Sequence, residues 1–269
     1  MSIIAPYDRE ALRRSYRAAR PFPHMKIDGF LETAAAQAAS ESFTTFDDAR
    51  KVGFEFNAVN ENLKVQITDP EKFPSPIKRI ADALSSQSFL DDLSYISGID
   101  NLIWDPTYSG GGIHQTARSG WLDVHVDFNF NEQLQLHRRL NILVYLHPKW
   151  EENWGGLIEL WDTEVKHREQ AYVPEFNRCV VFSTSEISYH GVTAVEGPPG
   201  TQRCSFAAYY YTREAPAGWD GTKHTTLFKT RPDEYMKRHL LMPAEAAKRA
   251  TREGMRSIKR GLKDLLGGK

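Results

Sequence analysis

The chain has 269 residues, and its 34 Lys/Arg and 35 Asp/Glu give a formal net charge of −1, which provides no overall field to attract nucleic acid. Hydrophobic residues at 41%, with aromatic residues at 12%, are enough to form a folded core and exclude a mostly disordered chain. Two cysteines, Cys179 and Cys204, exclude a disulfide or cysteine-rich zinc scaffold, and with no signal-peptide pattern and no apolar run of membrane-spanning length we expect a cytoplasmic protein.

The first hundred residues are predicted to be mainly helical. Segments rich in Ala, Leu and Arg have high helix propensity, and prolines at positions 74 and 76 favour the start of a helix. The predicted helices are Glu10–Arg20, Leu31–Ser40, Ile77–Leu84 and Phe89–Ile96.

From Asn101 onward, short β-rich runs follow one another, separated by Gly- and Pro-containing turns. The predicted strands are Leu102–Tyr108, Gly120–Phe128, Leu140–His147, Leu157–Trp161, Cys179–Ser183, His190–Val195 and Cys204–Thr212. Closely spaced strands without long helices between them predict a mostly β fold, an antiparallel barrel or two-sheet jelly roll, with the N-terminal helices packed on one sheet. We expect one domain over 1–236, comprising a helical part (1–100) and a β core (101–213).

The last part of the chain, 237–269, is predicted to be a basic amphipathic helix. It contains ten Lys/Arg against three acidic residues, a net charge of +7, which leaves −8 on the rest of the chain. Its apolar residues recur at steps of three and four, as on one stripe of a helix. We expect Ile258 and Leu262 to be buried against protein. Contact of 248–266 with anionic lipid, or with an acidic partner, is the alternative.

The residues that indicate chemistry begin at 121–128, which read Trp-Leu-Asp-Val-His-Val-Asp-Phe. The alternation predicts a strand on which His125 and Asp127 share one face and can share one metal ion, although a solvated polar strand face would give the same pattern. His190 lies on a later strand-like run. Two histidines and one carboxylate leave three positions of an octahedral metal open, as in non-haem Fe(II) oxygenases, whereas structural zinc uses four protein ligands.

Two further polar residues, Arg203 and Ser205, alternate toward one face of the last predicted strand. The planar guanidinium of arginine forms two parallel hydrogen bonds with a carboxylate, and a serine hydroxyl beside it adds a third donor. This pair suits one end of a dicarboxylate cosubstrate.

Taken together, the order His125-x-Asp127, His190, Arg203-x-Ser205 resembles the Fe(II)/2-oxoglutarate-dependent dioxygenases, and within them the prolyl-4-hydroxylase-like branch. The stretches Leu143–Trp150 and Trp154–Leu160 are also similar to that branch, so the resemblance covers about residues 100–213. It implies a double-stranded β-helix (jelly roll) with iron between two sheets.

The resemblance also implies residue roles. The metal ligands would be His125, Asp127 and His190, and the residues around 2-oxoglutarate would be Arg203, Ser205, Tyr145 and Asn141. The implied cofactors are Fe(II) and the cosubstrate 2-oxoglutarate, with ascorbate as a stimulant and O2 as oxidant. The implied reaction is hydroxylation of an aliphatic C–H bond of a prolyl or other amino-acid-type substrate, peptidyl or small, with release of succinate and CO2. Arg203 stands where many animal and plant members of the branch have Lys, which disfavours a collagen-type substrate.

Two other functions stay open at this point: a hydroxylase of a small natural-product or glycan-linked metabolite, and a non-catalytic jelly-roll protein that binds a metal or ligand. Arg203-x-Ser205 argues against the second, because a pure metal binder needs no dicarboxylate clamp. Some residues have both a pocket role and an ordinary packing role as alternatives: His114, Trp121 and Tyr209. We expect His137 and His147, beside polar turns, to lie at the surface.

Overall fold

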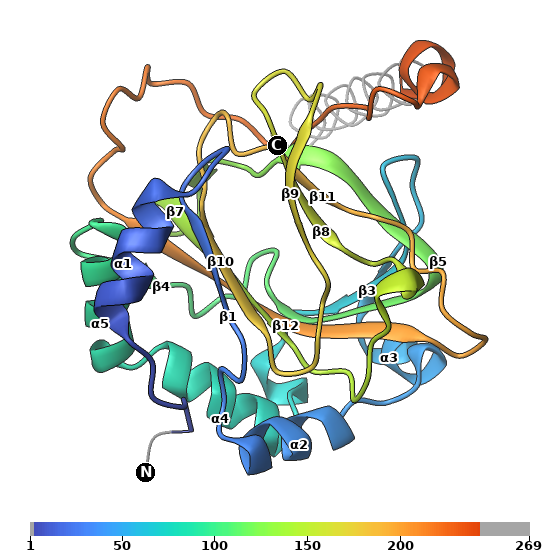
Figure 1. Ribbon diagram of the computed structural model, residues 1–269, viewed down its shortest axis with the longest axis horizontal. Coiled ribbons are helices and arrows are strands. Elements are labelled where there is room, and N and C mark those ends of the chain that lie inside the picture. The colour runs from blue at the N-terminus through green and yellow to red at the C-terminus, as the bar shows by residue number, and fades with distance from the viewer. Residues whose placement is uncertain (1–2, 243–269) are drawn as a thin grey trace, which may run out of the picture.

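A curled antiparallel sheet dominates the computed structural model, which describes residues 3–242 (Figure 1). The strands are β1 (His24–Ile27), β2 (Phe54–Phe56), β3 (Glu61–Ile67), β4 (Ile103–Trp104), β5 (Gly112–Val126), β6 (Phe130–Asn131), β7 (Leu136–Tyr145), β8 (Ile158–Trp161), β9 (Arg168–Tyr172), β10 (Cys179–Ser183), β11 (His190–Val192), β12 (Gln202–Thr212) and β13 (Leu227–Phe228). The α-helices are α1 (Arg9–Ala18), α2 (Thr33–Glu41), α3 (Phe46–Val52), α4 (Ser75–Leu84) and α5 (Gln87–Ser97). There are also two short 3-10 helices, η1 (Pro70–Lys72) and η2 (Glu152–Trp154), and a π-helix, η3 (Lys237–Leu241).

The long strand β5 belongs to both halves of the curled sheet. The strand order is β1-β10-β7-β12-β5-β11-β8-β9, with every pairing antiparallel. Residues 112–117 of β5 pair with β12, whereas residues 122–125 pair with β11. A strand that changes partners along its length turns one sheet toward the other, as in jelly-roll folds. The predicted mostly β jelly-roll core is thereby confirmed.

The strands β1, β10, β7 and β12, with the start of β5, form the larger half-sheet. The helices cover one face of it, as the blue and green segments of Figure 1 show. Strand alternation decides which side chains they cover. On β7, Leu140, Ile142 and Val144 pack in the main core with the helices, whereas Leu143 and Tyr145 belong to clusters on the other face. The predicted packing of the N-terminal helices on one sheet is therefore confirmed, and the space between the two half-sheets is left for a site.

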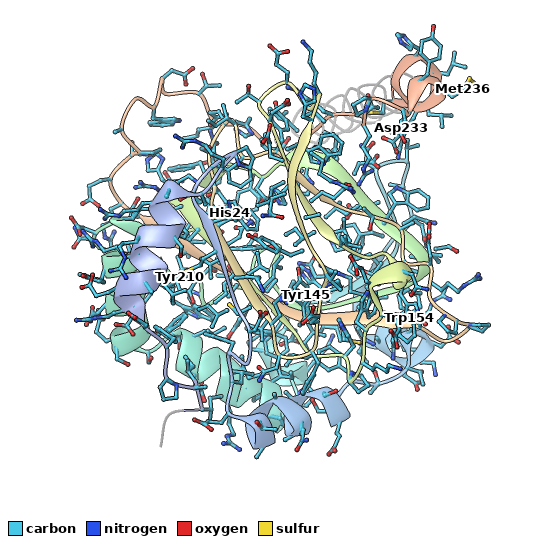
Figure 2. All side chains as sticks on the ribbon, in the orientation of Figure 1. His24, Tyr145, Trp154, Tyr210, Asp233 and Met236 are labelled. Carbon is cyan, nitrogen blue, oxygen red and sulfur yellow. The ribbon has the colours of Figure 1, made fainter. Side chains whose placement is uncertain are left out.

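Tyr210 of β12 marks the helical side of the sheet in Figure 2, and Tyr145 lies between the half-sheets. The Tyr210 hydroxyl donates a 3.0 Å hydrogen bond to the carbonyl of Leu84 at the end of α4. On the same helix Ile77 and Ile80 are fully buried. Burying a side chain of this size stabilises the fold by about 1.5–3 kcal/mol, so the packing of α4 stabilises this face of the sheet.

The prediction of a mainly helical first hundred residues is wrong for three segments, because β1, β2 and β3 also lie there. Each of these strands is short. β1 pairs with β10 and β3 pairs with β5, and in both pairs the partner lies more than 40 residues away in the sequence. β9 was not predicted either, since its sequence is mostly polar. Local propensity does not reveal strands that exist through distant pairing.

The strand predicted at 102–108 is reduced to β4, and β5 begins eight residues earlier than predicted. No helix within residues 3–242 is long and apolar enough to cross a membrane. Ile258 and Leu262, with the rest of 243–269, lie outside the described residues, so the basic helix and the domain boundary at 236/237 stay predictions.

The core between sheet and helices generates a stability prediction. Phe206 is fully buried, with its ring centroid 5.8 Å from that of Phe73. We expect Phe206→Ala to lower the free energy of unfolding by about 3–5 kcal/mol in urea denaturation, because it leaves a large cavity. Phe54→Ala, at a side chain that is 66% exposed, is the matched control and should change it by less than about 0.5 kcal/mol. Equal losses in the two variants would contradict this assignment of the core.

Candidate metal centre and cosubstrate cavity

His125 and Asp127 lie on β5, and His190 lies on β11 directly opposite His125 in the strand register. Nε2 of His125 is 3.5 Å from Oδ1 of Asp127, and Nε2 of His190 is 3.4 Å from Oδ2. One ligand atom from each of the three residues lies within 4.8 Å of the others. The structure thus brings together the three residues that the sequence pattern singles out, in a cluster able to hold one metal ion.

The hydrogen bonds of the two imidazoles fix which ring nitrogen faces the cluster. Nδ1 of His125 donates to the carbonyl of Asp123 at 2.8 Å, and Nδ1 of His190 donates to the carbonyl of Ser188 at 2.9 Å. Since a carbonyl only accepts, the proton of each neutral ring is on Nδ1 and the lone pair is on Nε2. Burial, reinforced by His125, lowers the pKa of His190 to about 3, which keeps its ring neutral and able to bind a metal.

The charge of Asp127 is maintained by neighbours on β7. Arg138 approaches Oδ2 of Asp127 with Nη2 at 3.1 Å, and the amide of Asn141 donates to the same oxygen at 2.7 Å. Burial alone would raise the pKa of Asp127, but Arg138, with His190 and His125, holds it well below its usual range. The carboxylate is therefore ionised and oriented, with Oδ1 toward His125 and Oδ2 toward His190.

Arg138 is a site residue that the sequence analysis missed. Its guanidinium is buried and lies 3.5 Å above the ring of Tyr209, while Nε and Nη2 donate to Asn141 Oδ1 at 3.0 and 2.8 Å. Strict alternation from Asn141 would turn Arg139 inward instead. However, Tyr210 and Tyr211 pair with Leu140 and Arg138, so β7 has one extra residue, a β-bulge. No local sequence feature indicates this bulge.

The alternation expected over 121–128 also breaks, at Asp123. Between their pairs with His190 and Val192, β5 advances three residues while β11 advances two. Leu122 consequently lines the same cavity as the proposed ligands, whereas Asp123 binds Lys237 Nζ at 2.6 Å. Strict alternation would place Asp123 on the face of His125, but this bulge rotates the strand and turns Asp123 away from the cavity.

A cavity of about 360 Å³ lies between the half-sheets at this cluster. It is lined by apolar and aromatic side chains together with a few polar ones, as is usual for small-molecule sites. Its lining includes Phe56, Glu61, Lys64, Gln66, His114, Trp121, Leu122, His125, Asp127, Phe128, Arg138, Asn141, Leu143, Ile158, Phe182, His190, Arg203, Tyr209, Thr225, Thr226 and Phe228.

Arg203 gives this cavity a positive charge without a balancing carboxylate. It is buried, its Nε donates to the carbonyl of Gly156 at 2.8 Å and its Nη2 to the hydroxyl of Tyr145 at 3.1 Å. Within residues 3–242 it has no ion-pair partner. A buried cation without a counterion is costly, so this position favours an anionic ligand.

Gly156 shows why the Gly-Gly turn precedes β8. Its φ of +66° lies in the left-handed region, and a Cβ there would meet the Trp150 ring at 2.8 Å and Arg203 Cδ at 3.2 Å. Glycine avoids both problems, which allows its carbonyl to accept from the guanidinium.

Ser205 and Tyr145 lie side by side on β12 and β7, next to Arg203. Both are fully buried, and the hydroxyl of Ser205 has no hydrogen-bond partner within the described residues. An unpaired buried hydroxyl beside an uncompensated guanidinium fits a carboxylate ligand. Asn141, unlike Ser205 and Tyr145, is among the residues that line the cavity, but its amide group already binds Asp127 and Arg138.

The three less certain pocket candidates all line the cavity: His114, Trp121 and Tyr209. Burial, with Lys64 and Arg203, lowers the pKa of His114 to about 3, so its ring is neutral. The hydroxyl of Tyr209 donates to the carbonyl of Gly110 at 2.6 Å and fixes the glycine-rich turn before β5.

His137 and His147 are buried, so the expectation that they lie at the surface is wrong. His147 donates from Nε2 to the carbonyl of Pro174 and accepts at Nδ1 from the amide of Cys204. His137 packs its ring 4.5 Å from that of Trp219. Their positions beside turns did not reveal that later segments cover them.

Comparison with known proteins agrees with this geometry. Residues 111–211 match the family model of the 2OG-Fe(II) oxygenase superfamily. That region contains the three clustered residues as well as Arg203 and Ser205. Over this region the chain is similar to the Fe(II)- and 2-oxoglutarate-dependent oxygenases.

Individual relatives are prolyl hydroxylases. The chain is 26% identical over 223 residues to mouse prolyl 3-hydroxylase OGFOD1, an alignment that covers 78% of this chain and 36% of that protein's length. By fold it is similar to a Pseudomonas putida prolyl-4-hydroxylase (TM-score 0.53, 15% identity, 75% of this chain and 99% of the other). A Trichoplax adhaerens prolyl hydroxylase in complex with a hypoxia inducible factor peptide fragment is similar to the same degree (TM-score 0.53, 15% identity, 76% and 90%).

The contact between Arg138 and Asp127 generates a pH-dependent prediction. In Arg138→Met, burial is no longer opposed by the cation, so the pKa of Asp127 rises and protons compete with metal at higher pH. We expect the affinity for Mn²⁺ to fall by about 10–100-fold near neutral pH, as for other residues that orient a ligand, and the acid-side loss of binding to begin at higher pH. Mn²⁺ titration at several pH values measures both. Arg139→Met, the adjacent half-buried arginine, is the control, and an unchanged pH profile in Arg138→Met would contradict the prediction.

Proposed function

We propose that this protein hydroxylates an aliphatic C–H bond of a prolyl or other amino-acid-type substrate and converts 2-oxoglutarate to succinate and CO2. The observation that carries the proposal is the presence of the His125–Asp127–His190 cluster and the uncompensated Arg203 in one cavity. A centre with three protein ligands and open positions suits Fe(II) that must also bind a cosubstrate and O2.

The residues present fit both groups. Two neutral imidazoles and one ionised carboxylate offer the N/O donor set of a non-haem iron centre, and we assign His125, Asp127 and His190 to it. We assign the distal carboxylate of 2-oxoglutarate to Arg203, with the hydroxyls of Ser205 and Tyr145 as additional partners. These residue roles are proposed from the geometry of the cavity together with the similarity to the superfamily.

When bound, Fe(II) and 2-oxoglutarate supply the oxidation, in which O2 contributes one oxygen atom to succinate and one to the substrate C–H bond. The protein contributes orientation and a dry site. Arg203 fixes one end of the cosubstrate, Arg138 and Asn141 fix the Asp127 carboxylate, and apolar side chains such as Leu143 and Phe182 limit the access of water.

A peptidyl proline is the substrate that the relatives favour. The mouse relative is named a prolyl 3-hydroxylase, and the Trichoplax neighbour binds a peptide. The alignment covers about a third of the mouse protein's length, so the substrate that its name gives is a proposal for this chain. The cytoplasmic location expected from the sequence remains a prediction.

Turnover of 2-oxoglutarate tests the proposed chemistry. Succinate should appear from 2-oxoglutarate with Fe(II), O2 and ascorbate, and a matching peptide or amino acid should gain the mass of one oxygen atom. Proline-containing peptides and free amino acids form the substrate panel. Asp127→Ala should abolish both products while the protein remains folded by circular dichroism, since it removes a ligand and little core volume. Succinate production at the wild-type rate in that variant would contradict the metal assignment.

The role of Arg203 has a separate test. Arg203→Ala should raise the KM for 2-oxoglutarate at least about tenfold, because truncating one partner of a buried charged hydrogen bond costs about 2 kcal/mol or more. Arg213→Ala, at an exposed arginine just after the same strand, is the matched control and should leave the KM unchanged. Wild-type saturation by 2-oxoglutarate in Arg203→Ala would show that another group holds the carboxylate.

A further inference from the structure

The segment after β12 returns to the edge of the proposed metal centre, outside the region 111–211 that matches the family model. Its strand β13 pairs with β5 so that Phe228 lies opposite His125, with ring centroids 5.4 Å apart. The amide of Lys229 donates to the carbonyl of Val124 at 2.8 Å. This segment therefore forms part of the cavity wall and then passes behind the strand that carries two of the proposed ligands.

Behind that strand, Arg231 joins two buried carboxylates. Its side chain is 14% exposed, and those of Asp123 and Glu159 are 0% and 3% exposed. Arg231 binds Glu159 Oε2 through Nε and Nη2, both at 2.8 Å, and approaches Asp123 Oδ1 with Nη1 at 3.5 Å. Buried carboxylates require such a partner, so a residue distant in sequence is fixed at this point of the sheet.

The same guanidinium also contacts the backbone of both ligand-bearing strands. Nη2 of Arg231 donates to the carbonyl of Leu122 on β5 at 3.4 Å and to that of Val192 on β11 at 3.3 Å. Leu122 and Val192 are opposite each other in the register, on the far side of the bulge from the His125–His190 pair. Arg231 therefore bridges β5 and β11 where their regular pairing is interrupted.

The absence of a side chain at Gly191, next to His190, allows this contact. A Cβ at this position would lie 3.2 Å from Nη2 of Arg231 and 3.1 Å from the backbone nitrogen of Val124. Both distances are tighter than ordinary van der Waals contact, so the absence of a side chain leaves room for the guanidinium over the strand.

We propose that Arg231 is a positioning residue that holds β5 and β11 in the register that places His125 and His190 on one metal ion. The inference rests on the proposed metal centre. Metal ligands must be held to within about 0.5 Å, and at a bulge the ladder of backbone hydrogen bonds between two strands is locally disrupted. Arg231 supplies contacts across this interruption by binding both strands and two carboxylates at once, without touching the metal, cosubstrate or substrate.

Mn²⁺ binding to the metal-free full-length protein tests this role separately from turnover. The dissociation constant is measured by the loss of the free Mn²⁺ signal in electron paramagnetic resonance, below the melting temperature of each variant. We expect Arg231→Met to raise it about tenfold, the range typical of residues that orient metal ligands. Arg168→Met is the matched control, because Arg168 binds the other oxygen of Glu159 at 3.0 Å from β9, and within residues 3–242 no hydrogen bond or ion pair joins its side chain to β5 or β11. That variant should bind Mn²⁺ within twofold of wild type.

Arg231→Lys keeps the charge but has a single nitrogen, which cannot contact both carbonyls and both carboxylates. It should fold and still bind Mn²⁺ several-fold more weakly than wild type, and it serves as the test if Arg231→Met does not fold. Wild-type affinity in Arg231→Lys, or an equal loss in Arg168→Met, would overturn the bridging role and leave only a charge effect. Absence of Mn²⁺ binding by the wild-type protein would instead overturn the proposed metal centre, and this inference with it.

Discussion

The charge of Asp127 is the constraint around which the site is arranged. Its side chain is 12% exposed, and an isolated carboxylate at that depth would bind a proton rather than a metal. Arg138, itself 1% exposed, supplies the opposing charge from a different strand, and Asn141 hydrogen-bonds to both. For Arg138 to reach inward, β7 must bulge. The bulge in that strand thus allows one buried carboxylate to stay ionised.

Three arginines near β5 have different electrostatic roles. Arg138 and Arg231 are each paired with carboxylates of the chain, one on the cavity side of β5 and one behind it. Arg203 contacts a carbonyl and a hydroxyl, and within residues 3–242 no carboxylate balances it. Arg138 and Arg231 stabilise the positions of the protein's own side chains. Arg203 instead provides a buried position where the interaction with a bound carboxylate is stronger than it would be in water.

The helices and the C-terminal segment support the curled sheet from different sides. α4 and α5 pack on the outer face of the larger half-sheet and leave its inner face free for the cavity (Figure 1). β13 and Arg231 cover the other end of β5, and Asp233 in Figure 2 lies on the opposite side of the molecule from those helices. A metal centre built on strands held from both ends is more precise than one built on loops.

The class of fold could be predicted from the sequence alone, because alternation and turn residues indicate an antiparallel β core. Alternation also predicted that His125 and Asp127 share one strand face, whereas the roles proposed for His190 and Arg203 came from the resemblance of the whole motif order to a known family. Tertiary structure alone decided the positions of Arg138, Asp123 and Arg231. The first two depend on bulges, which reverse a strand's alternation without a local sequence pattern, and the third depends on a segment that returns from more than 100 residues away. Which buried charges pair with each other is set by where distant strands meet, and a period-two pattern carries no information about that.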